Sequence, residues 1–253
     1  MEDSQVKTVG IIGSTGSVGS NACEIIQNHL QGKIIVEFLT CNNNADKLLN
    51  QADNLKPKSI CITGKNRDKI KEYASHKGIQ LYTDINELLS SCKVDVIVYA
   101  ISGIDGIKYL ENAIQATKVL AIANKEAIVS AWQFIEQYSV EHRTNIIPID
   151  SEHNSLYRLL EVIPEAHIDK VCITASGGRF FGKKFNSLAE VTFQDAVNHP
   201  IWNMGVKNSI DSSTMANKVL ELIELMQIFR YKEEDIDIFI NRQSVVHSGV
   251  YLK

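Results

Sequence analysis

The stretch Gly13-Ser14-Thr15-Gly16-Ser17-Val18-Gly19 follows the apolar run Val6 to Ile12 and opens a helix-like segment, Ser17 to Leu30. The spacing is G-x-x-G-x-x-G at a strand-to-helix turn. Glycines let the backbone turn tightly and approach a pyrophosphate, and the helix N-terminus offers N–H groups and the positive end of its dipole. The alternative is a glycine-rich turn without a ligand. Because the loop belongs to the first strand–helix unit, dinucleotide binding is the preferred interpretation.

Outward from this loop, apolar strand-like runs alternate with helix-like segments. The further runs are Ile34 to Leu39, Ser59 to Thr63, Val94 to Ala100, Val119 to Ala123 and Ile146 to Ile149, with helical patterns at Asp84 to Ser91, Gly106 to Ala116 and Glu126 to His142. This alternation predicts an α/β fold with a parallel sheet covered on both faces, a doubly wound Rossmann-like domain. We expect it to span residues 1–149.

After Asp150 the order of elements changes. A strand at Ile168 to Ala175 is followed by a polar stretch, a long helix from about Ser213 to Phe229 and strands within Ile236 to Leu252. We expect residues 150–253 to form an α+β catalytic domain. Lys253 falls inside a strand-like run, which indicates a piece of a longer protein.

Composition limits the classes of function. The 253 residues are 44% hydrophobic and 22% charged with net charge −4, which fits a soluble globular protein and argues against nucleic-acid binding. No apolar run approaches the roughly 20 residues of a membrane span. The acidic, polar start Met1 to Gln5 does not resemble a targeting segment, so we expect the cytoplasm. Five scattered cysteines indicate buried free thiols in a reducing compartment rather than disulfides or a zinc site.

The end of the second strand indicates which dinucleotide is bound. NAD-binding domains usually carry an acid there for the ribose 2′-hydroxyl. Here the strand ends in Asn42-Asn43-Asn44, and Glu37 lies too early. Without a carboxylate to repel a 2′-phosphate, NADP is favoured over NAD. The alternative is a polar loop that contacts nothing.

An acidic segment, Asp150-Ser151-Glu152-His153, follows the sixth strand-like run. In an extended chain Asp150 and Glu152 would share a face and His153 would point the opposite way. Converging carboxylates need a proton or a cation, and oxygen ligands favour Mg²⁺ or Mn²⁺ over zinc. On this segment alone, however, a helix N-cap is the preferred interpretation.

A third carboxylate lies on the long helix, which we expect to begin near Ser212. Asn217 and Lys218 precede Glu221 by four and three residues, so the three side chains share a helix face. One interpretation is a surface Lys–Glu pair. The other is a phosphate-binding set beside a metal-binding Glu221.

Three further segments fit an anionic substrate. Ser176-Gly177-Gly178 can present a hydroxyl and backbone N–H groups to an oxyanion, and Asn124-Lys125-Glu126 follows another strand. The segment from His199 to Gly205 contains Trp202, which is either a core anchor or part of a lid over a ligand.

Together these motifs resemble the 1-deoxy-D-xylulose 5-phosphate reductoisomerase family. The resemblance runs in order through GSTGSVG, ANKE, PIDSEHNS, ASGGRF, HPIWNMG, DSSTMANKVLE and QSVVHS. PIDSEHN and the S-x-T-M-x-N-K-x-x-E stretch are highly specific for this family, whereas the glycine loop is not.

The resemblance implies NADPH-dependent conversion of 1-deoxy-D-xylulose 5-phosphate to 2-C-methyl-D-erythritol 4-phosphate, with a sugar phosphate as the substrate and a homodimer as the assembly. It assigns the divalent metal (Mg²⁺ or Mn²⁺, with Co²⁺ as a further candidate) to Asp150, Glu152 and Glu221. The catalytic set would add Lys125 and His199. Substrate contacts would come from Lys125, Ser151, Glu152, Ser176, His199, Trp202, Ser212, Asn217, Lys218 and Glu221. The cofactor would lie against Thr15, Gly16, Ser17, Val18, Asn42, Asn43, Asn44, Asn124, Glu126 and Gly205.

The sequence also departs from the family. Asn42-Asn43-Asn44 stands where the family tends to have Gly-Lys-Asn, Asn203 replaces a common Ser, and Arg179 replaces a common Pro. The chain stops before the family's C-terminal helical domain. Two alternatives remain open: another NADP-dependent oxidoreductase of a sugar phosphate or semialdehyde, and a dinucleotide-sensing module without catalysis.

Overall fold

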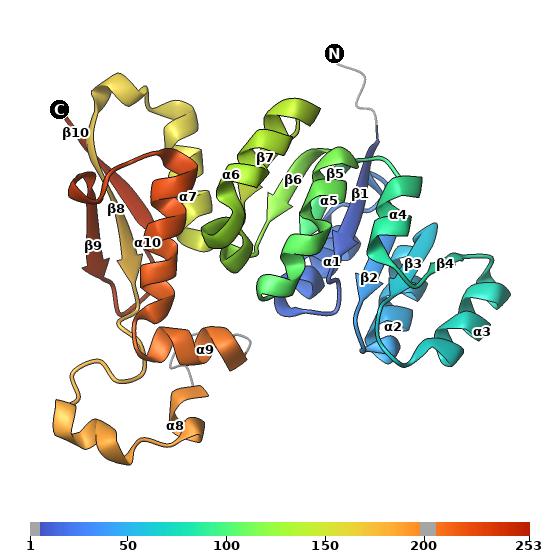
Figure 1. Ribbon diagram of the computed structural model, residues 1–253, viewed down its shortest axis with the longest axis horizontal. Helices are drawn as coiled ribbons and strands as arrows, with labels where there is room; N and C mark the ends of the chain where they lie inside the picture. The colour runs from blue at the N-terminus through green and yellow to red at the C-terminus, as the bar shows by residue number, and fades with distance from the viewer. Residues whose placement is uncertain (1–5, 198–205) are drawn as a thin grey trace. The chain divides into compact units, whose positions relative to one another are not determined.

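The computed structural model of the chain describes residues 6–197 and 206–253. The chain divides into two compact units, Met1–Ile147 and Pro148–Lys253, here called unit 1 and unit 2. Figure 1 shows the elements of both units in chain order. Among the described residues, no helix is long and apolar enough to cross a bilayer.

Unit 1 contains seven strands joined mainly by helices. The strands are β1 (Lys7–Ile12), β2 (Ile34–Cys41), β3 (Ser59–Ile62), β4 (Gln80–Tyr82), β5 (Val94–Tyr99), β6 (Thr117–Ile122) and β7 (Asn145–Pro148). The α-helices are α1 (Ser17–His29), α2 (Ala45–Leu55), α3 (Arg67–Lys77), α4 (Ile85–Ser91), α5 (Leu110–Gln115) and α6 (Lys125–His142), with a 3₁₀ helix, η1 (Ile104–Tyr109), before α5. β7 crosses the division between the units by one residue.

The strands form one sheet in the order β4-β3-β2-β1-β5-β6-β7. β1 pairs in parallel with both β2 and β5, and the pairs β2–β3, β3–β4 and β5–β6 are also parallel. After β4 the chain returns to place β5 on the other side of β1, which makes β1 the switch point of the topology. This order confirms the predicted doubly wound α/β fold, and ligands of such sheets bind outside the carboxyl ends of the strands at this point.

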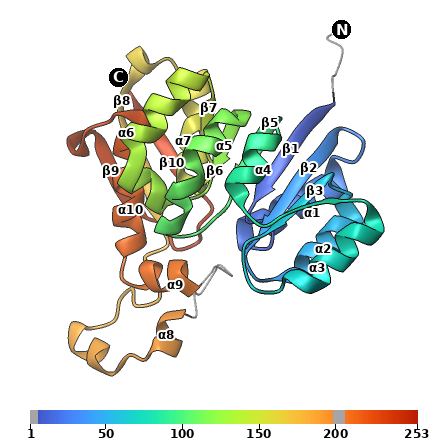
Figure 2. The ribbon, with the colours of Figure 1, turned by 45° about the vertical axis from the view of Figure 1, so that its right-hand side comes forward.

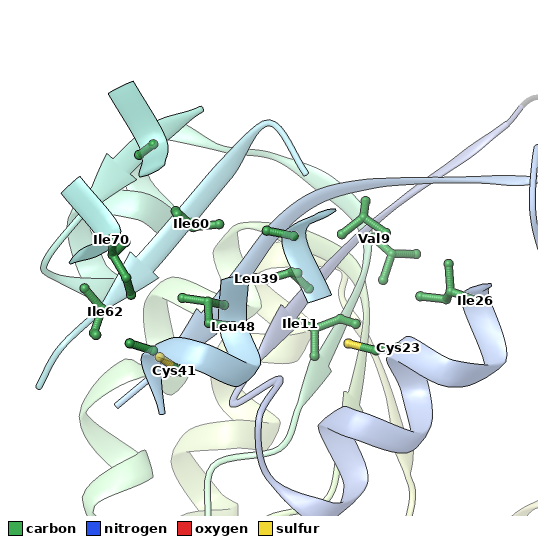
Figure 3. Close-up of a cluster of buried hydrophobic side chains, with 14 residues drawn as sticks. Val9, Ile11, Cys23, Ile26, Leu39, Cys41, Leu48, Ile60, Ile62 and Ile70 are labelled. Atoms are coloured by element: carbon green, nitrogen blue, oxygen red, sulfur yellow. The ribbon is translucent and has the colours of Figure 1, made fainter. Parts of the chain in front are cut away.

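One face of the sheet is closed by α1, α2 and α3. Figure 3 shows this core, in which Cys23 and Ile26 of α1 and Leu48 of α2 lie against Ile11 and Leu39 of the strands. α4, α5 and α6 lie on the opposite face (Figure 2). All five cysteines are free, and burial raises the pKa of Cys61 in β3 to about 12. The strands are therefore apolar on both faces, which is why they read as continuous apolar runs.

Unit 2 is an α+β unit with its own small sheet, as predicted. Its strands β8 (Ile168–Ala175), β9 (Ile236–Ile240) and β10 (Ser248–Leu252) lie in the order β10-β8-β9. β8 is parallel to β9 and antiparallel to β10. Its α-helices are α7 (Ser151–Val162), α8 (Phe193–Val197), α9 (Val206–Ser213) and α10 (Ala216–Phe229), and its 3₁₀ helices are η2 (Glu165–His167), η3 (Phe185–Glu190) and η4 (Glu233–Asp235).

α7 and α10 pack on one face of this sheet. Leu156 of α7 and Leu225 of α10 are fully buried against Val171 and Ile173 of β8. The long helix expected from about Ser213 to Phe229 is found as α10 but begins at Ala216, because Met215 adopts a left-handed backbone conformation with φ of 65° between α9 and α10. This break places Ser212 at the end of α9 rather than at the start of α10.

Candidate active site

The segment after β7 begins a helix rather than continuing as a strand. Asp150 is the N-cap of α7, and its side chain accepts a hydrogen bond from the backbone N–H of Ser151 at 3.0 Å. Glu152 lies in the first helical turn, where a negative charge is favoured by the helix dipole. The extended geometry expected for Asp150 and Glu152 is therefore wrong, and the N-cap interpretation of Asp150 is correct.

The same helical turn directs His153 inward, which corrects the expectation that it faces away from the site. His153 is fully buried, and its Nε2 lies 2.9 Å from the backbone carbonyl of Glu221 on α10. Because a carbonyl oxygen only accepts, Nε2 is the donor of this bond. The same Nε2 lies 3.7 Å from a carboxylate oxygen of the buried Glu224. His153 therefore joins the start of α7 to the turn of α10 that carries Glu221.

Glu221 projects from α10 toward the start of α7. Asn217, one turn earlier, donates a side-chain hydrogen bond to Glu221, and Lys218 forms an ion pair with it. The Lys218 ammonium also lies 3.4 Å from the carboxylate of Glu152. The Lys218 and Glu221 side chains are only 7% and 3% exposed, so the expected i,i+3 pair exists but is not a surface pair. An ammonium buried between two carboxylates partly compensates their repulsion.

Asp150, Glu152 and Glu221 each offer a carboxylate oxygen, and these atoms lie within 4.8 Å of one another. Three carboxylates against the single ammonium of Lys218 leave the cluster with a net negative charge. Hard oxygen donors at this spacing suit Mg²⁺ or Mn²⁺. A second group of possible ligands joins Asp150 to His153 and Glu224. We favour the all-oxygen group, because three carboxylates match the preference of Mg²⁺ and Mn²⁺ for hard oxygen ligands.

His247 also borders the carboxylates, and sequence reasoning gave it no role. Its Nδ1 lies 3.5 Å from Glu152. The residue is the last of the β9–β10 connection, and its carbonyl accepts from the N–H of Thr174 at 2.9 Å. The motif QSVVHS, which ends with His247 and Ser248, was the sequence feature that could have pointed to His247 as a site residue.

Ser176 and Ser212 belong to two segments that lie in contact. Ser176-Gly177-Gly178 follows β8, and both glycines have positive φ, 83° and 72°. A Cβ on Gly178 would lie 2.2 Å from the backbone carbonyl of Ser212, so only glycine lets the turn approach the end of α9 this closely. Ser151, at the start of α7, donates its hydroxyl to Glu152 at 2.7 Å.

In unit 1 the glycine loop connects β1 to α1, as predicted. Gly13 has φ of 83°, and a Cβ on Gly19 would lie 2.3 Å from the Gly13 carbonyl, so helix and loop could not meet as closely with a side chain. Buried Ser14 donates its hydroxyl to Gln51 at 2.8 Å, which fixes the loop against α2. α1 begins after Gly16 with no side-chain cap and no acid in its first turn. This arrangement suits an anion.

Thr15 and Val18 are partly exposed, and Gly16 and Ser17 are exposed. Every one of these residues lies at the carboxyl end of β1. A ligand phosphate can therefore reach the loop from solvent.

The asparagines after β2 have structural partners of their own. Asn44 caps α2 by accepting from the N–H of Lys47 at 3.1 Å. Asn43 accepts from the N–H of Lys65 at 3.3 Å, and Asn42 accepts from the hydroxyl of Thr63 at 3.2 Å. These bonds bring the β3–α3 connection against the loop. Lys65 is a positive residue next to Asn43 that sequence reasoning missed, because it lies 22 positions along the chain.

The segment Asn124-Lys125-Glu126 forms the start of α6, at the carboxyl end of β6. Asn124 is fully buried; it caps α6 by accepting from the N–H of Ala127 at 2.8 Å and donates to the carbonyl of Gly103 at 3.0 Å. Lys125 is also buried, at 7% exposure. β5, β6 and the glycine loop after β1 thus contribute to one edge of the sheet.

Comparisons with known proteins identify the family. One sequence model of 1-deoxy-D-xylulose 5-phosphate reductoisomerase matches residues 9–132, and a model of the C-terminal domain of the same enzyme matches residues 146–229. The curated enzyme of that name from Pelagibacter ubique is 36% identical over 97% of this chain and 64% of its own length. The enzyme of that name from Bacteroides fragilis is 37% identical over 99% of this chain and 65% of its own length.

This chain belongs to the 1-deoxy-D-xylulose 5-phosphate reductoisomerase family. The fold supports the same assignment. A crystal structure of the reductoisomerase in complex with NADPH, fosmidomycin and magnesium superposes with a TM-score of 0.87 at 35% identity, over 97% of this chain and 64% of that one. The Zymomonas mobilis reductoisomerase in complex with NADPH gives a TM-score of 0.86 at 34% identity, over 98% and 65%. This chain thus spans about two thirds of the length of its reductoisomerase relatives.

Three of the residues predicted for the sites fall in the part of the chain that is not described. His199, Trp202 and Gly205 lie outside the described residues. The predicted metal ligands, with Ser151, Asn217 and Lys218, come together within unit 2. The predicted cofactor residues that are described lie after β1, β2 and β6 of unit 1. Sequence reasoning missed Lys65, Glu224 and His247 as neighbours of these sites.

Proposed function

We propose that this protein converts 1-deoxy-D-xylulose 5-phosphate to 2-C-methyl-D-erythritol 4-phosphate, using NADPH and a divalent cation, Mg²⁺ or Mn²⁺, with Co²⁺ as an alternative. The observation that carries the proposal is the convergence of Asp150, Glu152 and Glu221 within 4.8 Å beside a buried lysine. An oxidoreductase that only moves a hydride to a carbonyl has no need of such a cluster. The relatives solved with NADPH and with magnesium support both cofactors.

In unit 2 the three carboxylates would hold the cation. When bound, the cation acts as a Lewis acid on the substrate's carbonyl and neighbouring hydroxyl oxygens and promotes rearrangement of the carbon skeleton. Asn217 holds the Glu221 carboxylate through its amide, and His153 holds the backbone of the same residue. Ser151 donates its hydroxyl to Glu152 and so orients that carboxylate, and the hydroxyl oxygen of Ser151 would accept from a substrate hydroxyl.

The substrate phosphate would bind between two segments of unit 2. One contains Ser176 and the end of α9 with Ser212, which touches the turn at Gly178. The other is the first turn of α10, where Asn217 and Lys218 lie at a helix N-terminus. A helix N-terminus and an ammonium both attract a phosphate. Lys218 would then exchange part of its contact with Glu152 and Glu221 for the phosphate, while the cation neutralises the carboxylates.

In unit 1 the pyrophosphate of NADPH would lie on the glycine loop and the N-terminus of α1, against Thr15, Gly16, Ser17 and Val18. The asparagines at 42–44 would face the 2′-phosphate, and Lys65, whose backbone N–H donates to Asn43, would add the positive charge that they lack. Asn124 and Glu126 would complete the cofactor site, and the family resemblance assigns Lys125 to the substrate. These residues would hold NADPH, which would supply the hydride for the reductive half of the reaction.

We also propose a cytoplasmic homodimer. The five free cysteines suit a reducing compartment. Unit 2 exposes neighbouring apolar side chains on its edge strand β9, namely Ile238 at 40%, Phe239 at 49% and Ile240 at 43%. Patches of this kind mark protein interfaces. Light scattering of the purified protein tests this assembly, and a monomer at all concentrations would contradict it.

The function is tested by incubating the protein with the ketose phosphate and NADPH, with Mn²⁺ and with a chelator. Loss of NADPH absorbance should require the metal, and mass spectrometry should find the branched polyol phosphate. Metal-independent reduction to an unbranched product would instead indicate a simple sugar-phosphate or semialdehyde oxidoreductase. NADPH binding without any turnover would indicate a sensing module.

A further inference from the structure

Arg242, in the β9–β10 connection, contacts the turn that carries Ser176. One nitrogen of its guanidinium, Nη1, donates to two backbone carbonyls, that of Ser176 at 3.0 Å and that of Gly178 at 3.1 Å. The guanidinium carbon lies 4.9 Å from the centre of the Phe181 ring, in a cation–π contact. One side chain therefore ties two peptide groups of the turn to the strand connection 64 residues further along the chain.

The turn is closed on its other sides as well. A Cβ on Gly177 would lie 2.8 Å from the Phe181 ring and 3.2 Å from Ile240, and one on Gly178 would collide with the Ser212 carbonyl. Both glycines have positive φ. Glycine adopts this conformation at little energetic cost, but it adopts others as readily, so the pair by itself does not select it. External contacts must therefore select this conformation over the others available to a Gly-Gly pair.

The direction of the two carbonyls determines the direction of two N–H groups. The peptide bonds of the turn are trans, and in a planar trans peptide the N–H points opposite to the C=O. When Arg242 holds the carbonyls of Ser176 and Gly178, the N–H groups of Gly177 and Arg179 point away from it. Arg242 therefore fixes the peptide groups on both sides of the Gly-Gly pair, and the Gly178 N–H between them donates to the Ser176 hydroxyl oxygen at 3.4 Å, so the place of that hydroxyl depends on the shape of the turn.

We infer that Arg242 is a positioning residue for phosphate binding: it fixes the Ser176–Gly178 turn, and with it the Ser176 hydroxyl that would contact the phosphate. It does not touch the phosphate itself. The inference rests on the proposed function, because it takes this turn as part of the phosphate site. Arg242 lies in a segment that is distant in the sequence from the other phosphate-binding residues. Through Arg242, the shape of the turn, and not the Ser176 hydroxyl alone, determines the affinity for phosphate.

The test compares Arg242→Ala and Arg242→Lys with Arg158→Ala. Arg158 is an exposed arginine of α7 that pairs with Glu161, so its removal changes the net charge equally without touching the turn. We expect Arg242→Ala to raise KM for the ketose phosphate roughly 5–30-fold, the effect of losing hydrogen bonds from a charged group. The kcat and the dissociation constants of NADPH and Mn²⁺ should stay unchanged. Arg242→Lys should recover only part of the loss, because an ammonium lacks the planar group that stacks on Phe181.

Inorganic phosphate, titrated by calorimetry, separates this inference from the proposed function. Weaker phosphate binding in Arg242→Ala, in a protein that never turns over the ketose phosphate, would support the inference and reject the function. Turnover with a KM and phosphate affinity equal to those of Arg158→Ala would keep the function and overturn the inference. Full recovery by Arg242→Lys would also overturn it, since charge alone would then suffice.

Discussion

The glycine loop of unit 1 and the carboxylate cluster of unit 2 are suited to charged ligands of opposite sign, and they use different groups to bind them. The loop offers backbone N–H groups at the start of α1, with no acidic side chain in the first turn. The cluster offers charged side chains, with Glu221 and Lys218 nearly excluded from water. The first site depends on how closely backbone segments approach each other. The second depends on how buried charges balance, so the two should respond differently to substitution.

The largest effect should come from removing one charge of the cluster. Glu221→Gln keeps the size of the side chain but removes a ligand, and we expect Mn²⁺ affinity to fall more than about 100-fold, the upper end for losing an outer-shell partner. Metal-dependent turnover should fall with it, while NADPH affinity stays unchanged. Glu161→Gln, on the exposed surface of α7, is the control. Equal losses of NADPH and Mn²⁺ affinity in Glu221→Gln would show that the two sites are not separate.

The corresponding substitution in unit 1 adds side-chain volume rather than removing a charge. In Gly19→Ala the new Cβ would lie 2.3 Å from the Gly13 carbonyl, so the loop must shift. We expect a stability loss of about 1–3 kcal/mol, together with weaker NADPH binding and unchanged Mn²⁺ binding. Gly16→Ala is the matched control for stability, because its Cβ would find its nearest neighbour at 3.4 Å. Thermal unfolding that is the same for both variants would contradict the close approach described for Gly19.

Substitution of Lys218 tests whether its ammonium binds both the carboxylates of unit 2 and the substrate phosphate. If Lys218 binds the phosphate, Lys218→Met should raise KM for the ketose phosphate tenfold or more, since a charge-assisted contact is worth about 1.5–3 kcal/mol. Mn²⁺ affinity should not fall, because the variant leaves all three carboxylates in place. Lys232→Met, an exposed lysine near η4, is the control. An unchanged KM with lower stability would mean that Lys218 serves only its carboxylate partners.

The smallest effect is expected at the edge of the NADPH site. Asn43→Lys should tighten NADPH more than NADH, and the gain should shrink as salt rises, because the added contact is electrostatic. Since Lys65 already lies next to Asn43, Lys65→Ala should weaken NADPH modestly in the wild type. Dissociation constants of both nucleotides for each protein decide the matter. An equal change in the dissociation constant of NADH, or no change for either nucleotide, would show that this loop does not contact the 2′-phosphate.

The two regions also differ in how far the sequence alone predicts them. The strand–loop–helix of unit 1 follows from local signals: an apolar run, glycines at fixed spacing and a helical pattern. The cluster of unit 2 draws on β7, α7 and α10, so its members could be identified individually, but not their contacts. The pair of His153 with the Glu221 carbonyl depends on the packing of two helices. The partners of Arg242 lie 64 and 66 positions away, and no local sequence pattern predicts these contacts.

The start of the long helix was predicted about three residues too early for a different reason. The expected start near Ser213 is the end of α9, and Met215 takes a left-handed conformation that methionine rarely adopts, so α10 begins only at Ala216. Residue preference predicts the common conformation, so a single exception of this kind shifts an element boundary.

The most direct test of two separate ligand sites is a titration of the wild-type protein with Mn²⁺ in which NADPH binding and turnover of the ketose phosphate are measured on the same samples. If unit 1 binds the nucleotide through its backbone and unit 2 binds the metal through its carboxylates, turnover will rise in proportion to Mn²⁺ occupancy. The NADPH dissociation constant will stay constant from metal-free to saturated protein. An NADPH affinity that rises and falls with Mn²⁺ occupancy, or turnover that persists in chelator, would contradict this account.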